Sequence, residues 1–439
     1  MMRRFDLTFW LLFLTIILGV ALRIYCVFVV DLSPELDFRR YYEVAENLAA
    51  GRGITLSETP YVAQPPLYPL LLGGWFFISE ANVMSGKVLN LLLSVFTLLS
   101  WAWLVARARF PAWMQVVSLL IIAVHPAMVA YVVVLGTETL SVFLCTSLLA
   151  VAMLRSSLRW PLLGFISGFA ILNRPQLLVV PMFVGGVILL LPMLRSRFCR
   201  GAIMLMIVPL LVVAPWMIRN FLTFDVFVPV SANSGYVLMV NNNENNGSGA
   251  WMPLSQVPLS DENLMAFERH AGMGRDFFAG DDEGLKFRMW TPQADKVASD
   301  VGKKWIVSNP LDFVELAWMR LKITYDIDSL MMWPFRQDAG LPNALMQITY
   351  ALDLVLALLS VLGCVVGLLF RPRDRLLLSW LCALAVMFGI IAGVLLFEGQ
   401  GRYLMPMLPA QVFVIMILFS PREAWTSLNR NSVGADVMA

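Results

Sequence analysis

Long apolar segments recur along this chain of 439 residues, and they constrain its fold more than any other feature. A helix needs about 20 apolar residues to cross the hydrocarbon core of a bilayer. A membrane-spanning backbone must also satisfy its own hydrogen bonds, which a helix does within one segment. The apolar segments lie at residues 8–30, 88–106, 113–131, 139–154, 160–172, 176–194, 201–218, 343–370, 376–397 and 405–419. The sequence therefore predicts an all-α polytopic membrane protein with about ten transmembrane helices.

The composition supports a membrane protein and argues against other classes. Apolar residues make up 59% of the chain and charged residues 14%, whereas soluble domains contain about 45–50% and about 25%. The net charge of +2 gives no reason to expect a nucleic-acid partner. The five cysteines lie in or beside apolar segments without metal or redox spacing, so we interpret them as packing residues.

Two segments need separate treatment, because one missed crossing would invert the topology of everything after it. Residues 67–79 are apolar but too few to span, which indicates an interfacial or re-entrant helix on the outer face. Residues 159–195 are too many for one ordinary span, and Asn173-Arg174-Pro175 interrupts them near the middle. Two short antiparallel spans that turn at this tripeptide fit best.

The orientation follows from the distribution of Lys and Arg, which concentrate in cytoplasmic loops. If the N-terminus lies inside, the short outer turns hold only Arg174 and Arg402. The inner segments then hold Arg3, Arg4, Arg107, Arg109, Arg155, Arg159, Arg195, Arg197, Arg200, Arg371, Arg373, Arg375, Arg422 and Arg430. Both termini are therefore predicted to be cytoplasmic.

This topology leaves two long segments outside, residues 31–87 and 219–342, and nearly all the carboxylates lie there. The chain then divides into an N-terminal transmembrane module (1–218, including the loop 31–87), a mainly helical outer segment (219–342) and C-terminal transmembrane helices with a short cytoplasmic tail (343–439). Within the outer segment, the Asn-rich residues 241–249 are predicted to be an exposed loop, and 283–300 and 301–325 to be helical. Any chemistry should face outward.

A cluster of charged and aromatic residues, 34–42, directly follows the first span. It contains Glu35 and Asp37, then Arg39, Arg40 and Tyr41. Carboxylates beside a bilayer are costly to desolvate, so such a cluster is a candidate functional site. A proline followed by acidic residues is equally typical of a helix start, where the carboxylates complement the helix dipole. The local sequence favours neither interpretation.

Other outer-face residues complement this cluster. Glu138 lies at the outer start of a span, where it either stabilises a helix terminus or takes part in chemistry. A departing phosphate needs nearby positive charge, although a single interfacial cation is more often an anchor. The outer cations are Arg39, Arg40, Arg174, Arg219, Lys322 and Arg402. His125 is predicted to have a hydrogen-bonded packing role.

Seven motifs occur in order along most of the chain. They are Glu35-x-Asp37, Asp37 with Tyr41, Gln64-Pro65-Pro66-Leu67-Tyr68-Pro69, Thr137-Glu138-Thr139-Leu140, Asn173-Arg174-Pro175, Pro215-Trp216-Met217-Ile218-Arg219-Asn220 and Gly401-Arg402-Tyr403-Leu404-Met405-Pro406. By these motifs and their placement, the chain resembles the GT-C superfamily of membrane glycosyltransferases. It is most similar to the branch that contains protein mannosyltransferases and the bacterial aminoarabinose transferase.

The resemblance implies a GT-C fold with outer juxtamembrane helices and an inverting transfer of a sugar from a polyprenyl phosphate, such as undecaprenyl phosphate. The acceptor would be a hydroxyl group of a periplasmic protein, lipid A or a cell-envelope glycan. The enzyme would lie in the bacterial inner membrane with its active site facing the periplasm. The resemblance makes Asp37 the general base or acceptor-positioning carboxylate, with Glu35 and Glu138 as further catalytic candidates. The donor would be bound by Arg39, Arg40, Tyr41, Tyr68, Arg174, Arg219, Lys322 and Arg402.

In the aminoarabinose transferase a loop glutamate and a later histidine hold a metal. Glu58 and His270 are the candidate counterparts here, and metal dependence stays open at this stage. No other cofactor is expected.

Two other functions compete with the transferase. A glycan polymerase or ligase that uses a lipid-diphosphate donor would share the outer site. A transporter of lipid-linked sugars would place ionisable groups near the bilayer midplane, on broken helices. The predicted spans are almost free of charge, with Asp353 the main exception. The transferase is therefore the preferred hypothesis.

Overall fold

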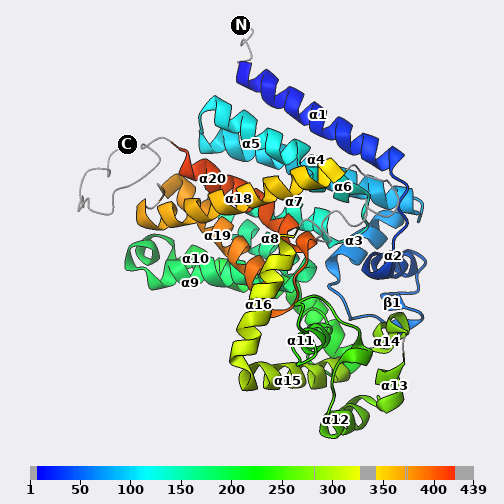
Figure 1. Ribbon diagram of the computed structural model, residues 1–439. Helices are drawn as coiled ribbons and strands as arrows, with labels where there is room; N and C mark the ends of the chain where they lie inside the picture. Colours follow the sequence, from blue (N-terminus) through cyan, green and yellow to red (C-terminus); the bar gives the residue numbers. More distant parts are fainter. Residues whose placement is uncertain (1–6, 281, 327–342, 371, 373, 421–439) are drawn as a thin grey trace.

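The computed structural model describes residues 7–280, 282–326, 343–370, 372 and 374–420, and these residues are mainly helical (Figure 1). The α-helices are α1 (Leu7–Val29), α2 (Leu36–Ala49), α3 (Leu67–Phe76), α4 (Val83–Ala108), α5 (Ala112–Val124), α6 (Pro126–Ala130), α7 (Thr137–Ala152), α8 (Arg159–Asn173), α9 (Val179–Leu190), α10 (Pro192–Phe224), α11 (Ser234–Asn241), α12 (Asp261–Ala271), α13 (Arg275–Ala279), α14 (Glu283–Met289), α15 (Pro292–Ser308), α16 (Pro310–Thr324), α18 (Asn343–Phe370), α19 (Asp374–Leu396) and α20 (Leu408–Leu418). Short 3-10 helices are η1 (Tyr131–Val133), η2 (Pro175–Leu178), η3 (Leu254–Gln256) and η5 (Gly401–Met407), and β1 (Thr55–Leu56) pairs with β2 (Thr59–Pro60) in an antiparallel hairpin.

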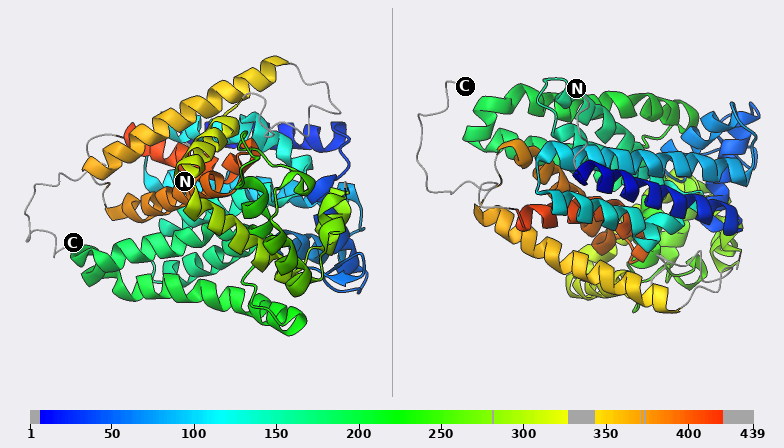
Figure 2. Two further views of the ribbon diagram at one scale, coloured as in Figure 1. Left: turned by 60° about the horizontal axis from the view of Figure 1, so that its bottom comes forward. Right: turned by 90° about the horizontal axis from the view of Figure 1, so that it is seen from above.

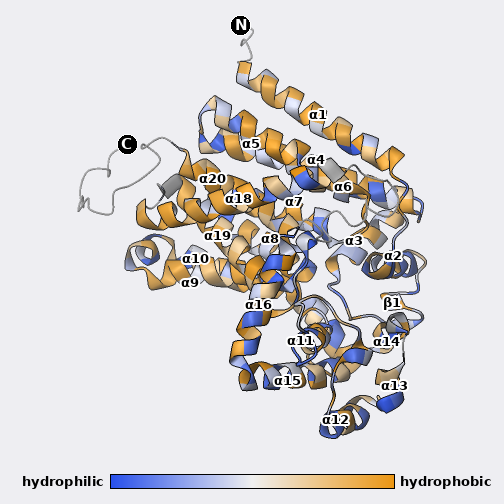
Figure 3. Cartoon of the chain, viewed as in Figure 1, coloured by the Kyte–Doolittle hydropathy of each residue, from blue (hydrophilic) through white to orange (hydrophobic). Residues whose placement is uncertain are grey.

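The apolar helices confirm a multi-pass, all-α membrane protein. Among the described residues, six helices are long and apolar enough to cross a membrane, or seven if the bent pair α5 and α6 forms one span. They run side by side in one general direction (Figure 2) and are coloured as hydrophobic over most of their length (Figure 3). The predicted count of ten spans is not confirmed, because α7, α8 and α9 have only 16, 15 and 12 residues. At about 1.5 Å per residue, each is shorter than about 30 Å of hydrocarbon.

The predicted boundaries hold in some places and shift in others. The helix α8 ends at Asn173 and η2 begins at Pro175, so the chain turns at the predicted tripeptide. The helix α3 has only 10 residues, so it is too short to span the membrane, as predicted. It packs against α2. The helix α10 begins at Pro192 rather than near Gly201, which places Arg195, Arg197 and Arg200 within a helix. The predicted inner residues Arg3, Arg4, Arg371, Arg373, Arg422 and Arg430 lie outside the described residues.

A buried arginine compensates for the break between α5 and α6. These helices meet at an angle of 55°, and Pro126 begins the second one. A break of this kind leaves carbonyl groups without helical partners, which is costly in hydrocarbon. Arg23 of α1 is 1% exposed, and its guanidinium donates to the carbonyls of Ile122 (3.1 Å) and Ala123 (2.6 Å). Arg23 therefore joins α1 to the bent pair of α5 and α6.

The residue that follows α5, His125, is buried, and its Nε2 lies 3.0 Å from a carboxylate oxygen of Asp353 in α18. This hydrogen bond confirms the predicted packing role of His125. It also explains how the carboxylate of Asp353 is accommodated within an apolar helix.

The segment between α10 and α18, which we call the cap segment (residues 225–326), has an apolar core of its own. Tyr236, Phe267, Phe278 and Trp290 pack together there, and α11 lies against α15. The predicted helices at 283–300 and 301–325 were wrong in their boundaries. Pro292 and Pro310 each begin a new helix, because proline lacks the N–H that a helix interior requires but fits the first turn.

The prediction of an exposed loop at residues 241–249 was also wrong for most of its asparagines. Asn241, Asn242, Asn243 and Asn246 are all buried. The Asn243 amide donates to two carbonyls at the end of α11, and the Asn246 amide donates to the carbonyl of Ala250. Asparagine side chains substitute for backbone partners in turns, so the Asn243 and Asn246 amides stay paired although they are buried. The buried side-chain amide of Asn241, in contrast, has no hydrogen-bond partner among the described residues.

Arg320 of α16 fastens the cap segment to the membrane helices. It is fully buried and donates to the carbonyls of Leu395 (2.8 Å) and Leu396 (3.2 Å) at the end of α19. It also donates to the carbonyl of Asn241 (2.6 Å) and to Oδ1 of Asn242 (2.9 Å). One side chain therefore pairs oxygen atoms at the ends of two helices, α19 and α11.

We expect Arg320→Ala to destabilise the protein by about 2–4 kcal/mol, because it removes four hydrogen bonds to buried oxygens. Among the described residues, it leaves only the Leu396 carbonyl with a second side-chain donor, the Asn242 amide. The measurement is the apparent melting temperature of the detergent-solubilised protein. Arg275→Ala is the matched control, since Arg275 and its partner Asp261 are both largely exposed and such pairs contribute little. Equal melting temperatures for the two variants would contradict the assigned role of Arg320.

Candidate functional site

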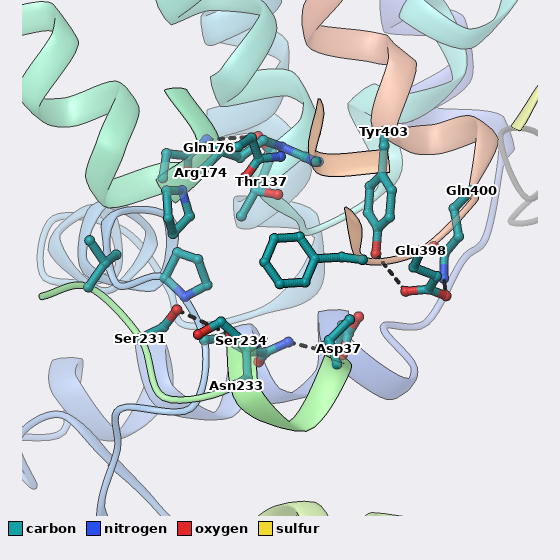
Figure 4. Close-up of a pocket in the computed structure, with 18 of the residues that line it drawn as sticks. Asp37, Thr137, Arg174, Gln176, Ser231, Asn233, Ser234, Glu398, Gln400 and Tyr403 are labelled. Atoms are coloured by element: carbon teal, nitrogen blue, oxygen red, sulfur yellow. Dashed lines mark hydrogen bonds between the residues drawn. The ribbon is translucent and has the colours of Figure 1, made fainter. Parts of the chain in front are cut away.

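A cavity of about 1210 Å³ lies where α2, α7, η2, α10, α19, η5 and the cap segment meet. One part of its wall is apolar and comes from η2, α10 and α19, for example Leu178, Leu210, Val213, Ile390 and Val394. The other part is polar and includes Asp37, Arg174, Ser231, Asn233 and Glu398, which converge on the cavity from different elements (Figure 4). The cavity is therefore suited to an amphipathic molecule.

The start of α2 places Asp37 at the edge of this cavity. Glu35 is the residue before the helix, and Asp37 lies in its first turn. Leu36 has a φ of 48°, a left-handed conformation that is unusual for a residue other than glycine. The predicted helix start is thus confirmed, and it directs Asp37 rather than Glu35 toward the cavity. Glu35 is exposed and does not line it.

Asp37 accepts hydrogen bonds from three side chains. Its Oδ1 accepts from Arg40 Nη1 (3.0 Å) and Gln64 Nε2 (2.9 Å), and its Oδ2 accepts from Arg402 Nη2 (3.0 Å). Two of these bonds join full charges and are stronger than neutral ones. Asp37 therefore connects the first loop with a residue near the C-terminal end of the chain.

A second carboxylate, Glu138, forms a buried ion pair with Arg174. The Arg174 guanidinium donates to Glu138 Oε1 at 3.0 Å and to the hydroxyl of Ser141 at 3.1 Å. The other oxygen, Glu138 Oε2, has no hydrogen-bond partner among the described residues. A Cβ atom at Gly136 would lie 2.5 Å from this oxygen and 2.7 Å from the Phe38 ring. Glycine is required there for α7 to approach α2.

The chain between α19 and η5 supplies residues that the sequence analysis missed. Glu398 and Gln400 are buried and line the cavity, as does Tyr403. Glu398 accepts hydrogen bonds from the Gln400 amide and from the Tyr403 hydroxyl. Burial raises the pKa of the Glu398 carboxyl group, whereas the charge of Arg402 and the hydrogen bonds from Gln400 and Tyr403 lower it and favour the ionised form. The available signal was the alternation of polar residues at 398, 400 and 402 between two apolar spans.

The cap segment contributes a neutral polar wall that the sequence analysis also missed. Ser231, Asn233 and Ser234 line the cavity, and the Ser231 hydroxyl donates to Asn233 Oδ1 at 3.2 Å. Two aromatic residues, Trp251 and Phe287, lie on the same wall. Hydroxyl, amide and aromatic groups of this kind are suited to binding a polar, uncharged group.

The structure brings together six of the predicted site residues and separates five others. Asp37, Arg40, Tyr41, Glu138, Arg174 and Arg402 all line the cavity. Burial raises the pKa of the Tyr41 hydroxyl, so this group remains a neutral hydrogen-bonding group. The residues outside the cavity lining are Glu35, Arg39, Tyr68, Arg219 and Lys322.

Three of the residues outside the cavity lining have structural partners elsewhere. Arg39 pairs with Glu43 on the exposed face of α2, and Lys322 lies over the Trp318 ring. The buried Tyr68 hydroxyl donates to Asn90. These three residues do not line the cavity, and their role in donor binding stays a prediction.

Arg219, at the end of α10, has a structural environment as well. Its guanidinium donates to the carbonyls of Tyr61 and Ile54 in the first loop. It also lies over the Trp216 ring. Arg219 therefore joins α10 to the first loop rather than entering the cavity.

The candidate metal ligands do not form a site. Glu58 lies in the exposed turn between β1 and β2, and His270 is exposed near the end of α12. Over the described ranges, no group of three His, Cys, Asp or Glu side chains lies close enough to hold a metal ion. The arrangement therefore does not supply the metal ligands that the resemblance implied.

Comparison with protein-family models and with curated sequences gives no match. Among solved structures, the chain is similar to the oligosaccharyltransferase AglB of Archaeoglobus fulgidus in complex with an inhibitory peptide and a dolichol-phosphate. The TM-score is 0.51 at 13% identity, over 94% of this chain and 50% of that one. ArnT of Cupriavidus metallidurans, bound to undecaprenyl phosphate, gives a TM-score of 0.45 at 15% identity, over 94% and 78%. This chain has the GT-C fold, as the resemblance predicted, and spans about half the length of AglB.

We expect Glu138→Gln to destabilise the protein by about 3–5 kcal/mol, because it would leave the buried Arg174 without its counter-charge. The double variant Glu138→Gln/Arg174→Gln should recover part of this loss. The measurement is the apparent melting temperature in detergent, with Arg39→Gln in the exposed Arg39–Glu43 pair as the control. A Glu138→Gln protein that melts with the wild type would contradict a stabilising ion pair.

Proposed function

We propose that this protein is an inverting glycosyltransferase that moves a sugar from a polyprenyl-phosphate donor to a hydroxyl group of an acceptor. The observation that carries this proposal is the position of Asp37. Its carboxylate lies between two arginines in a cavity that has an apolar wall on one side and a polar wall on the other. The GT-C fold supports the same reaction class by analogy.

The two parts of the cavity match the two parts of such a donor. The apolar wall between α10 and α19 would hold the first isoprene units, since burial of apolar surface favours binding. Arg40, Arg174 and Arg402 line the polar part and provide positive charge for the phosphate. The sugar would then lie close to Asp37.

The reaction is a single displacement at the anomeric carbon. The acceptor oxygen forms a bond to this carbon while the bond from the carbon to the phosphate oxygen breaks. Asp37 takes the proton of the acceptor hydroxyl, as a general base. The electron pair of the broken bond stays on the phosphate, and the arginines stabilise the charge that develops there. Attack from the face opposite the leaving phosphate inverts the anomeric configuration.

The ion pairs of Asp37 suggest how donor binding would prepare this residue for catalysis. Arg40 and Arg402 are both engaged by this carboxylate. A lipid phosphate would compete for the same guanidinium groups. Asp37 would then lose part of its charge-assisted hydrogen bonding, which frees its carboxylate oxygens to accept from the acceptor hydroxyl.

The acceptor is proposed to approach from the cap segment, where Ser231, Asn233, Ser234 and Trp251 line the cavity. We further propose that the acceptor is a protein, lipid A or an envelope glycan in the bacterial periplasm. The protein would lie in the inner membrane with the cavity on the periplasmic side, in agreement with the distribution of Lys and Arg.

The test of this function uses purified protein in nanodiscs, a panel of sugar-loaded undecaprenyl phosphates and an envelope extract as the acceptor. We expect Asp37→Asn to lower the release of undecaprenyl phosphate about 10²- to 10⁴-fold, because the general base is lost. The affinity for undecaprenyl phosphate should be unchanged or higher, since Arg40 and Arg402 are no longer held by a carboxylate. Undiminished turnover by Asp37→Asn would refute the role of this residue, and activity only with diphosphate donors would favour the polymerase or ligase.

A second variant tests the phosphate site. We expect Arg402→Gln to weaken binding of undecaprenyl phosphate about tenfold or more, because a charged hydrogen bond contributes about 1.5–3 kcal/mol. Binding is measured by the quenching of tryptophan fluorescence in nanodiscs. Arg39→Gln is the control, because Arg39 is exposed and does not line the cavity. Equal affinities for the two variants would exclude Arg402 from the phosphate site.

A further inference from the structure

Glu398 is a buried carboxylate beside the candidate site that the proposed reaction does not use. Its side chain is 5% exposed and lines the cavity next to Gln400 and Tyr403 (Figure 4). A buried carboxylate is costly unless its oxygens are paired. Both oxygens of Glu398 are paired, one with the Gln400 amide and the other with the Tyr403 hydroxyl at 3.1 Å.

These contacts form the first link of a chain that ends at Asp37. The Gln400 amide nitrogen donates to Glu398, and the Gln400 carbonyl oxygen accepts from Arg402 Nε at 2.7 Å. The same guanidinium then donates from Nη2 to Asp37 Oδ2 at 3.0 Å. Glu398 is thus connected to the proposed general base through two intermediate side chains.

The charge of Glu398 determines which atoms donate and which accept along this series of hydrogen bonds. An ionised carboxylate only accepts hydrogen bonds, and a guanidinium only donates them, whereas an amide does both. Gln400 must therefore turn its nitrogen toward Glu398 and its oxygen toward Arg402. A neutral side chain at position 398 would allow the opposite orientation of the amide, which would present a donor to the guanidinium and repel it.

We infer that Glu398 is a positioning residue: through Gln400 it fixes the Arg402 guanidinium in the orientation that serves both Asp37 and the donor phosphate. The part that concerns the phosphate rests on the proposed function. The connection between Glu398 and Arg402 stands on the contacts alone. Charged groups that interact electrostatically with Glu398 include Arg402 and Asp37 and, in α16, Arg320.

The experiment is a double-mutant cycle of Glu398→Gln and Arg402→Gln, with the dissociation constant for undecaprenyl phosphate as the readout. Glu398→Gln keeps the size of the side chain and removes its charge. We expect it to weaken binding about fivefold to tenfold in the wild-type background. In the Arg402→Gln background it should have no further effect, because the group through which it acts is absent. Glu262→Gln, at an exposed carboxylate of α12, is the matched control.

A residue that merely supports the loop would give a different result. Its loss would weaken binding by the same factor in both backgrounds, and this additive outcome would overturn the inference. So would an unchanged affinity in Glu398→Gln alone.

The apparent melting temperatures of the same four proteins provide a readout that needs no ligand. We expect the shift of the double variant to be smaller than the sum of the two single shifts. If the wild type fails to bind undecaprenyl phosphate, the donor class proposed above is wrong, and the melting temperatures still decide whether Glu398 positions Arg402. Additive shifts would overturn the positioning role.

Discussion

Arginines that donate to backbone carbonyls hold the main parts of this structure together. Arg23 pairs the carbonyls at the break between α5 and α6, and Arg320 pairs those at the end of α19. Arg219 does the same for the first loop, beside the end of α10. Each helix end or break leaves oxygens that need donors, and a guanidinium supplies several at once. At the break between α5 and α6, which lies within the apolar helices, hydrocarbon offers no water in place of these contacts.

The arginines of the cavity have a different kind of partner. Arg40 and Arg402 pair with Asp37, and Arg174 pairs with Glu138. A carbonyl contact fixes a guanidinium for a structural purpose, whereas a carboxylate can exchange its place with another anion. The partners therefore separate two groups of arginines that composition and topology alone could not distinguish. This separation is what supports phosphate binding by the second group.

Local sequence patterns predicted the features that depend only on neighbouring residues, namely apolar helices and helix starts. The apolar segments predicted a helical membrane protein, and the position of Asp37 and Glu138 directly after turns indicated two helix starts, both of which the structure contains. The role of Glu398 was not predictable in this way, because it depends on a hydrogen-bonded chain to a residue about 360 positions away. The burial of Asn241 was missed for the same reason, since the Arg320 side chain that pairs its carbonyl comes from a distant helix.

The balance of charge during the proposed reaction explains why the general base and the phosphate site share their arginines. The donor is a phosphodiester with one negative charge, and the leaving lipid phosphate carries a second one. At the same step Asp37 gains a proton and becomes neutral, so the total charge within the cavity does not change. Arg402, which forms an ion pair with Asp37, can follow the negative charge from the carboxylate to the phosphate. In a partly apolar cavity, where an uncompensated charge is costly, such an exchange avoids the need to bring in an ion for each turnover.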